Sequence, residues 1–170
     1  SNVIENYEEL MKAPNTPLFN RVLLGAYAPG STFKPCTAIA ALDQGIINTE
    51  DKIKCQGVFT KYAAEGYSPE CWIWSSYQMT HPEDNVTDAL RDSCNYFFYD
   101  VGRQLTIATM NNYCSAYGLG QPTGIELDES LGVLSGPEYR AENGLGAWSP
   151  GDTVQTAIGQ LDSLFTPLQM

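Results

Sequence analysis

Ser31 and Lys34 are the two residues whose types and spacing point most directly to a chemical reaction. They are three positions apart, and residues three apart on a helix are neighbours, with Cβ atoms roughly 5–6 Å from each other. Pro35 is tolerated only near the start of a helix, where its missing N–H would be unpaired, so the sequence predicts a helix that begins near Ser31. A hydroxyl beside an amine on one helical turn is a nucleophile beside a base.

A serine three residues before a lysine also has a simpler interpretation. Ser31 would then cap a surface helix, and Lys34 would point into solvent. A match of this length is expected about once by chance in a chain of 170 residues. The chemical interpretation is favoured by Pro29-Gly30, which allows a sharp turn into the helix, and by a second motif further along the chain.

Ser93 and Asn95 form this second motif, directly before the aromatic run 96–99. Alone, such a pair usually indicates a turn or a helix cap, because both side chains compete for backbone hydrogen bonds. Together with Ser31 and Lys34, the pair completes two of the three motifs of penicillin-binding proteins and class A β-lactamases.

On these residues the sequence resembles the transpeptidase domain of class B penicillin-binding proteins of the Gram-positive, clostridial type. The resemblance treats residues 1–170 as one partial domain, and it extends through segments 17–21, 27–35, 93–99, 117–120, 123–125, 151–153, 157–160 and 166–170. The third motif, Lys-Thr-Gly, does not occur in the 170 residues. The resemblance implies that it follows Met170, so that the chain is truncated before it.

The implied fold class is mainly α with a few short strands, the helical lobe of the α/β transpeptidase and serine β-lactamase-like fold without most of its central sheet. Local patterns predict individual elements that fit this class. We expect helices over Ile4 to Met11, Ser31 to Gly45 and Thr106 to Tyr117. A further helix should begin at Thr87 and break at 93–95, and a second helix should follow that break and end near Leu105. We also expect a hairpin of 52–55 with 57–62 and a short strand over 123–127.

The resemblance also implies a mechanism. Ser31 would be acylated by the D-Ala-D-Ala end of a peptidoglycan stem peptide or by a β-lactam, with Lys34 as base, Ser93 relaying a proton and Asn95 holding the substrate. Other partners would be proteins of a cell-wall synthesis complex, and no cofactor is implied. The parent protein would be anchored by a single membrane span outside this chain and would act on the extracytoplasmic face.

Two other classes of function remain open: a serine β-lactamase or β-lactam sensor, and a non-catalytic module of a cell-wall complex. Without the missing strand, we expect Lys34 to be open to water, with a pKa near its ordinary value of about 10.4, and acylation to be slow. A net charge of −11 with only 9 Lys and Arg residues argues against nucleic acid as a partner.

Five cysteines occur without a Cys-x-x-Cys pair, and His81 is the sole histidine, so the spacing predicts no metal site. The segment around Cys55 and Cys71 resembles a paired-cysteine insertion of some clostridial members, which implies a disulfide between them, as extracytoplasmic proteins favour. The alternative is that all five are buried thiols. Cys36 and Cys94 are expected to serve packing rather than chemistry.

Overall fold

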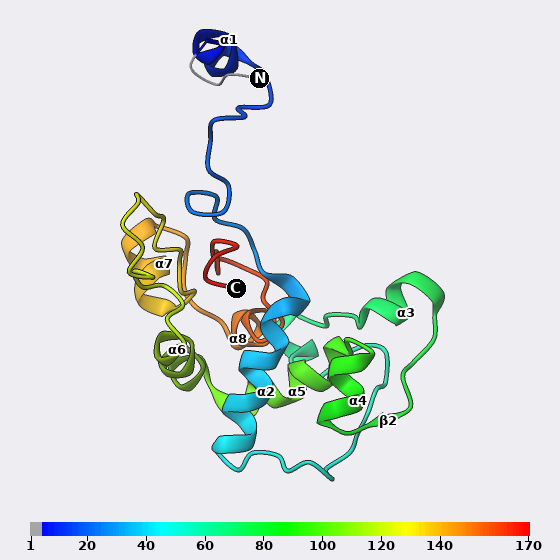
Figure 1. Cartoon of the computed structure of the whole chain (residues 1–170). Helices are drawn as coiled ribbons and strands as arrows, with labels where there is room; N and C mark the ends of the chain where they lie inside the picture. The colour runs from blue at the N-terminus through cyan, green and yellow to red at the C-terminus, as the bar shows by residue number, and fades with distance from the viewer. Residues whose placement is uncertain (1–4) are drawn as a thin grey trace.

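Helix α2 (Lys34–Asp43) runs through the middle of the main body of the fold, and other helices of that body lie beside it (Figure 1). The computed structural model describes residues 5–170. Ala38, Ala40 and Ala41 of α2 are buried, and these small side chains let neighbouring backbones approach closely. The helix contacts α4 (Val86–Arg91), α5 (Asn95–Leu105) and α6 (Ile107–Ala116), so the serine-lysine helix is held by the segment that carries the second motif.

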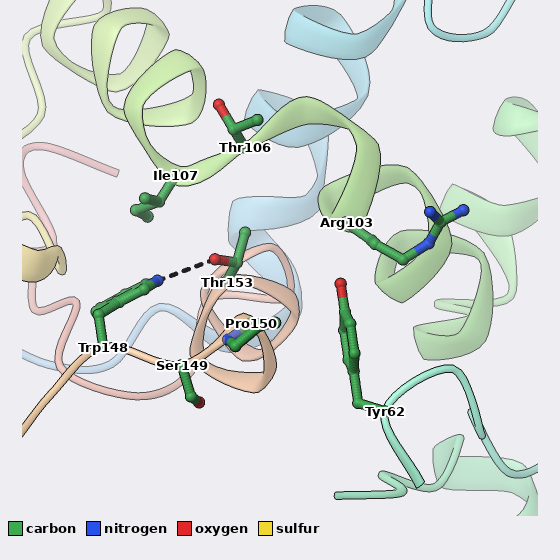
Figure 2. A pocket seen from close by; sticks show the side chains of 8 residues that line it. All are labelled: Tyr62, Arg103, Thr106, Ile107, Trp148, Ser149, Pro150 and Thr153. Carbon is green, nitrogen blue, oxygen red and sulfur yellow. Dashed lines mark hydrogen bonds between the residues drawn. The ribbon is translucent and has the colours of Figure 1, made fainter. Parts of the chain in front are cut away.

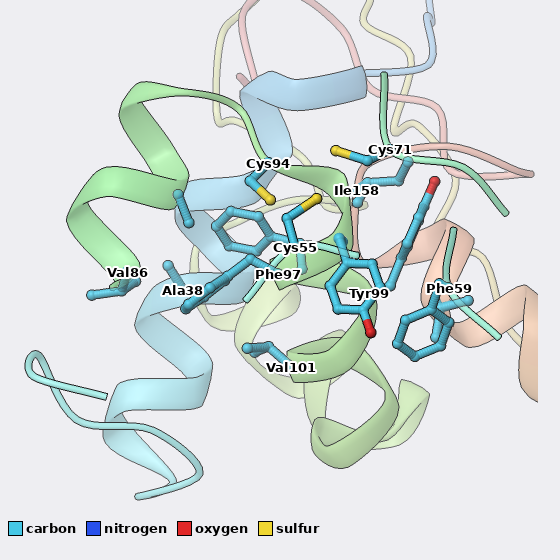
Figure 3. Close-up of a cluster of buried hydrophobic side chains, with 14 of the residues drawn as sticks. Ala38, Cys55, Phe59, Cys71, Val86, Cys94, Phe97, Tyr99, Val101 and Ile158 are labelled. Atoms are coloured by element: carbon cyan, nitrogen blue, oxygen red, sulfur yellow. The ribbon is translucent and has the colours of Figure 1, made fainter. Parts of the chain in front are cut away.

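Helix α5 supplies much of the apolar core. Its residues Phe97, Phe98 and Val101 are fully buried, and they project into a cluster that also contains Cys55, Cys71 and Cys94 (Figure 3). Helix α8 (Pro150–Thr156) packs on the same helix where Gly102 meets Ala157. The aromatic run after the second motif therefore anchors that motif to the core.

The remaining elements are short. They are α1 (Tyr7–Lys12), the 3-10 helices η1 (Gly30–Phe33) and η2 (Ala63–Glu65), α3 (Trp72–Tyr77), α7 (Pro137–Asn143), and the strands β1 (Ile53–Lys54) and β2 (Glu83–Asp84). Helix α1 lies apart from the other helices, at the end of an extended segment (Figure 1). The predicted start of the first helix, Ile4, lies outside the described residues. The predicted class, mainly α with a few short strands, is confirmed.

Several predicted boundaries hold because local chemistry sets them. Gly45 follows α2 in the left-handed region, with φ +64°. The Thr106 side chain accepts a hydrogen bond from the backbone N–H of Thr109 and caps α6. Helix α4 begins slightly earlier than predicted, because Asn85 accepts from the backbone N–H of Asp88.

Two predicted strand features are wrong. The segment 52–55 does not form a hairpin with 57–62; β1 instead pairs antiparallel with β2, with Ile53 opposite Asp84. No strand forms over 123–127 in the described chain, because Thr123 donates from its N–H and hydroxyl to the Glu129 carboxylate and Gly124 adopts φ +85°. Both errors concern pairing or side-chain contacts that periodicity does not encode.

Among the described residues, none of the helices combines the length and the apolar character that crossing a membrane requires.

The contact of α5 with α8 leads to a stability prediction. A Cβ on Gly102 would overlap the Cβ of Ala157, so Gly102→Ala should lower the free energy of unfolding by about 1–3 kcal/mol through overpacking. Adding Ala157→Gly should restore part of the loss. Urea denaturation measures both, with Asn112→Ala on the exposed face of α6 as a control expected within about 0.5 kcal/mol of the parent chain. Additive losses in the double variant would contradict the proposed contact.

Candidate active site

Ser31 lies on η1, the 3-10 turn that leads into α2. The turn is held by a hydrogen bond of 2.8 Å from the Gly30 N–H to the Gly159 carbonyl. Gly30 and Gly159 both adopt positive φ, and a Cβ on Gly159 would collide with the Gly30 backbone, so this approach requires glycine. The Ser31 side chain caps no helix and remains exposed, which leaves its hydroxyl free for chemistry.

Ser93 and Asn95 lie at the junction of α4 and α5. Ser93 occupies the left-handed region with φ +52°, an uncommon conformation for a residue with a Cβ. Cys94 is the N-cap of α5, and Asn95 is its first residue. The chain thus turns sharply at Ser93, and this turn directs both polar side chains of the motif toward Lys34.

The structure brings all four predicted residues together. Lys34 Nζ lies 3.1 Å from Ser31 Oγ, 2.8 Å from Ser93 Oγ, 2.8 Å from the Ser93 carbonyl oxygen and 2.6 Å from Asn95 Oδ1. The two hydroxyls of Ser31 and Ser93 are themselves 2.8 Å apart. The predicted convergence is confirmed, although the residues come from two motifs far apart in the chain.

Lys34 is buried, with only 1% of its surface exposed, and its Nζ lies 5.7 Å from the centroid of the Phe98 ring. Burial lowers its pKa from 10.5 to about 8, against a smaller opposing effect of the Cys71 and Cys94 thiols. The expectation that Lys34 would be open to water is therefore wrong. The helical lobe itself, through Phe98 and the second motif, encloses the amine.

The partners of Lys34 suit a neutral amine. Two of them, the Ser93 carbonyl and Asn95 Oδ1, can only accept hydrogen bonds. A neutral amine has two N–H donors, so these two acceptors use both of them and leave its lone pair for a serine hydroxyl. The site is therefore arranged for Lys34 to take a proton from Ser31.

A second group of reactive side chains lies beside the first. Cys55 and Cys71 are free thiols, so the predicted disulfide is wrong. Their sulfur atoms, the Cys94 sulfur and a ring nitrogen of His81 lie within 4.8 Å of one another, and all four residues are buried. Figure 3 shows the three sulfurs pointing toward a common space. Cys94 is thus more than a packing residue.

The three thiols interact directly. The pKa of Cys71 is lowered because the thiols of Cys55 and Cys94 donate to its sulfur, and the pKa values of those two are raised by the same contacts. Backbone N–H groups also point at the sulfurs: those of Gly57 and His81 at Cys55, those of Tyr96 and Ile73 at Cys71, and that of Phe97 at Cys94. Such N–H groups are the surroundings that thiolates require.

This group has the geometry of a metal-ligand set. The Cys71 sulfur lies 3.6 Å from His81 Nδ1. A tetrahedral zinc ion with bonds of about 2.3 Å to sulfur and 2.0–2.1 Å to nitrogen places those atoms about 3.6 Å apart. Three cysteines and His81 thus come together as a candidate ligand set that the sequence spacing did not predict.

Sequence spacing missed this set because its ligands come from four separate segments. Cys55 follows β1, Cys71 is the N-cap of α3, His81 precedes β2, and Cys94 is the N-cap of α5. The pairing of β1 with β2 brings Cys55 and His81 together. The one usable signal was that Cys94 lies inside the Ser93-x-Asn95 motif.

Apart from a hollow on α1, two hollows on the main body of the fold differ in their position relative to the four residues. One, of 540 Å³, is lined by Trp72, Ile73, His81, Arg91, Asp92 and Ser93, so it reaches from the second motif to the thiol group. The other, of 380 Å³, is lined by Tyr62, Arg103, Thr106, Ile107, Trp148, Ser149, Pro150 and Thr153 (Figure 2). The second shares no residue with the four converging side chains, so the first is the hollow associated with the active site.

A serine on a helix start, a buried lysine on the next turn and a Ser-x-Asn turn facing both form the motif arrangement of penicillin-recognising serine proteins. A family model described as penicillin binding protein transpeptidase domain matches residues 3–170. The chain belongs to this family.

Curated relatives agree with this assignment. The chain is 34% identical to the peptidoglycan D,D-transpeptidase MrdA of Acinetobacter baumannii over 98% of its own length and 24% of that protein, and 33% identical to MrdA of Escherichia coli K12 over 98% and 26%. Stage V sporulation protein D of Bacillus subtilis is 32% identical over 89% of this chain and 22% of that protein. The chain spans about a quarter of the length of these relatives.

Solved structures show the same fold. Pseudomonas aeruginosa PBP2 in complex with WCK 5153 superposes with a TM-score of 0.87 at 29% identity, over 97% of this chain and 37% of that one. Helicobacter pylori PBP2, in a complex with MreC, gives a TM-score of 0.85 at 27% identity, over 97% and 30%.

The environment of Lys34 leads to a prediction for its titration. In Asn95→Asp a carboxylate would stand 2.6 Å from Nζ, where it favours the ammonium form and should raise the Lys34 pKa by about one to three pH units. NMR of chains labelled at the lysine ε-carbon measures this, with the Lys34 signal assigned from Lys34→Met. Asn112→Asp, exposed on α6, should leave the titration near pH 8. A parent Lys34 that titrates near 10.5 would contradict the described enclosure.

Proposed function

We propose that the protein to which this chain belongs is a peptidoglycan D,D-transpeptidase that forms an acyl-enzyme at Ser31 and is inhibited by β-lactams. The observation that carries the proposal is the buried Lys34 amine, 3.1 Å from Ser31 Oγ and 2.8 Å from Ser93 Oγ. The printed names of the curated relatives and the β-lactam complexes among solved penicillin-binding proteins support it.

In the acylation step, Ser31 Oγ attacks the carbonyl carbon between the last two D-alanines while its proton passes to Lys34 Nζ. The carbon–nitrogen bond then breaks, and the leaving nitrogen takes a proton from Lys34 through the hydroxyl of Ser93. D-alanine leaves, and an ester at Ser31 remains. With a β-lactam, the same step opens the ring, and the nitrogen stays tethered to the acyl group.

In the second step, the amine of another stem peptide attacks the ester carbonyl and gives up a proton to Lys34. The ester bond breaks, Ser31 regains its hydrogen, and a new amide joins the two stems. The N–H of Ser31 would supply one donor to the oxyanion, and the amide of Asn95 would hold the substrate backbone.

The partners of the whole protein follow from the same proposal. MreC binds Helicobacter pylori PBP2, and another related chain comes from a peptidoglycan synthase complex, so we place this protein in an assembly of cell-wall synthesis. A stem-peptide substrate of this kind would lie outside the cell membrane, so we propose that the protein acts on the extracytoplasmic face. A β-lactamase is distinguished by rapid release of the penicilloyl group, and a transpeptidase retains it.

Acylation by penicillin tests the role of Ser31. Intact-protein mass spectrometry of the 170-residue chain should show slow addition of one penicilloyl group, with a rate that rises with pH through about 8 as Lys34 loses its proton. Ser31→Ala should show none, and Lys34→Met should be slower at every pH. A longer chain that adds a Lys-Thr-Gly strand, and with it a second oxyanion donor, should react about 10²–10³-fold faster. Equal labelling of Ser31→Ala would contradict the proposal.

We further propose that Cys55, Cys71, His81 and Cys94 bind one zinc ion. Four ligand atoms within 4.8 Å of one another, all from buried residues, support this. Three thiolates and a neutral imidazole are a ligand set typical of structural zinc. Because Cys94 lies between Ser93 and Asn95, an ion bound there would fix the backbone of the second motif.

Zinc content and affinity test this second proposal. The parent chain should contain one zinc ion per molecule, measured by plasma mass spectrometry after dialysis. Cys71→Ser should bind zinc more than about 100-fold more weakly, since losing a ligand exceeds the 10–100-fold effect of an outer-shell partner. Cys36→Ser removes a cysteine outside the set and should bind normally. A chain without zinc, whose mass is 2 Da low from a disulfide, would contradict the proposal.

A further inference from the structure

Asp84 is an unusual buried acid. Only 1% of its surface is exposed, and neither carboxylate oxygen has a hydrogen-bond partner in the described structure. No other Asp or Glu among residues 5–170 is buried to this extent. A carboxylate removed from water without donors is strongly disfavoured, so this position needs a physical reason.

His81, three residues earlier, has the complementary deficiency. It is 5% exposed, and its Nε2 is buried without a partner. Its other nitrogen, Nδ1, lies 3.6 Å from the Cys71 sulfur and therefore faces the thiols. When Nδ1 binds a metal, the neutral imidazole carries its hydrogen on Nε2, so the buried nitrogen becomes a donor that needs an acceptor.

The charges around Asp84 leave His81 as its natural partner. Burial is the main cause that raises the pKa of the Asp84 carboxyl; His81 opposes this rise, and the negative charges of Asp92 and Asp88 add to it. The guanidinium of Arg91 is already bound to Asp88 at 2.9 Å and to Asp92 at 2.7 Å. Binding of Cys94 to a metal would remove its thiol proton, so Cys94 would offer Asp84 no donor in the metal-bound site.

We propose that Asp84 is the outer-shell positioning residue of the zinc site: its carboxylate accepts the Nε2–H of His81 through one water molecule and holds Nδ1 toward the three sulfurs. The proposal rests on the zinc site proposed above. It also explains why the β1–β2 pair exists, because the pairing of Ile53 with Asp84 fixes this carboxylate beside the segment that leads to Cys55. Carboxylates in this position orient the ring and make the histidine a better ligand.

The experiment compares Asp84→Asn with Glu83→Gln, its exposed neighbour on the same strand. Zinc dissociation constants are measured by competition with a chelating dye, and thermal unfolding is followed with zinc and after its removal. Asp84→Asn should bind zinc about 10–100-fold more weakly. Its metal-free form should be as stable as the parent or more stable, because a buried unpaired charge is removed. Glu83→Gln should change neither quantity.

A purely structural role would produce a different result: Asp84→Asn would destabilise the metal-free chain and leave zinc affinity unchanged, which would overturn the inference. A cobalt(II) spectrum adds a second criterion. The variant should keep the sulfur-to-cobalt charge-transfer bands and the tetrahedral spectrum of the parent, and their loss would make Asp84 a direct ligand and refute the outer-shell role. If the parent chain binds no zinc, both the zinc proposal and the proposed role of Asp84 fail. If the parent chain binds zinc and Asp84→Asn binds it equally well, only the proposed role of Asp84 fails.

Discussion

The enclosure of the Lys34 amine is the constraint on which the rest of the structure depends. A lysine loses its proton near neutral pH only if its charged form is kept from water, and here Phe98 and the second motif cover it. That cover requires α5 to pack against α2, and the packing requires the small residues of α2 and the glycine at the crossing with α8. Much of the core therefore serves to exclude water from one nitrogen atom.

Ser31, Lys34, Ser93 and Asn95 could be predicted from sequence because few residue types fit the local structure around them. Pro35 fixes the start of the helix, and a Ser-x-Asn triplet before an aromatic run is rare enough to recognise. Helix ends marked by Gly45 and Thr106 were predictable for the same reason, since few residues satisfy a left-handed turn or a cap. The burial of Lys34 was not predictable, because it depends on how two distant helices meet.

The pairing of β1 with β2 and the grouping of the thiols escaped sequence analysis for a common reason. Each strand contains two residues, too few for alternation to show, and the loop between them is long. Cys55 and Cys71 were recognised as neighbours, but the presence of His81 and Cys94 beside them depends on that pairing. Once four ligands share one space, a disulfide between two of them would leave the others without partners. The resemblance that implied a disulfide thus paired two cysteines that lie, in the structure, among four candidate metal ligands.

The left-handed conformation of Ser93 has an evolutionary consequence. Glycine is the residue most at ease at φ +52°, but glycine has no hydroxyl, and asparagine tolerates the conformation with an amide in its place. This position therefore requires both a left-handed backbone and a side-chain hydroxyl, and no amino acid suits both. Serine supplies the hydroxyl but is disfavoured in the left-handed conformation. Replacement of Ser93 by glycine would relieve the backbone conformation and remove the hydroxyl, so stability and activity favour different residues at this position.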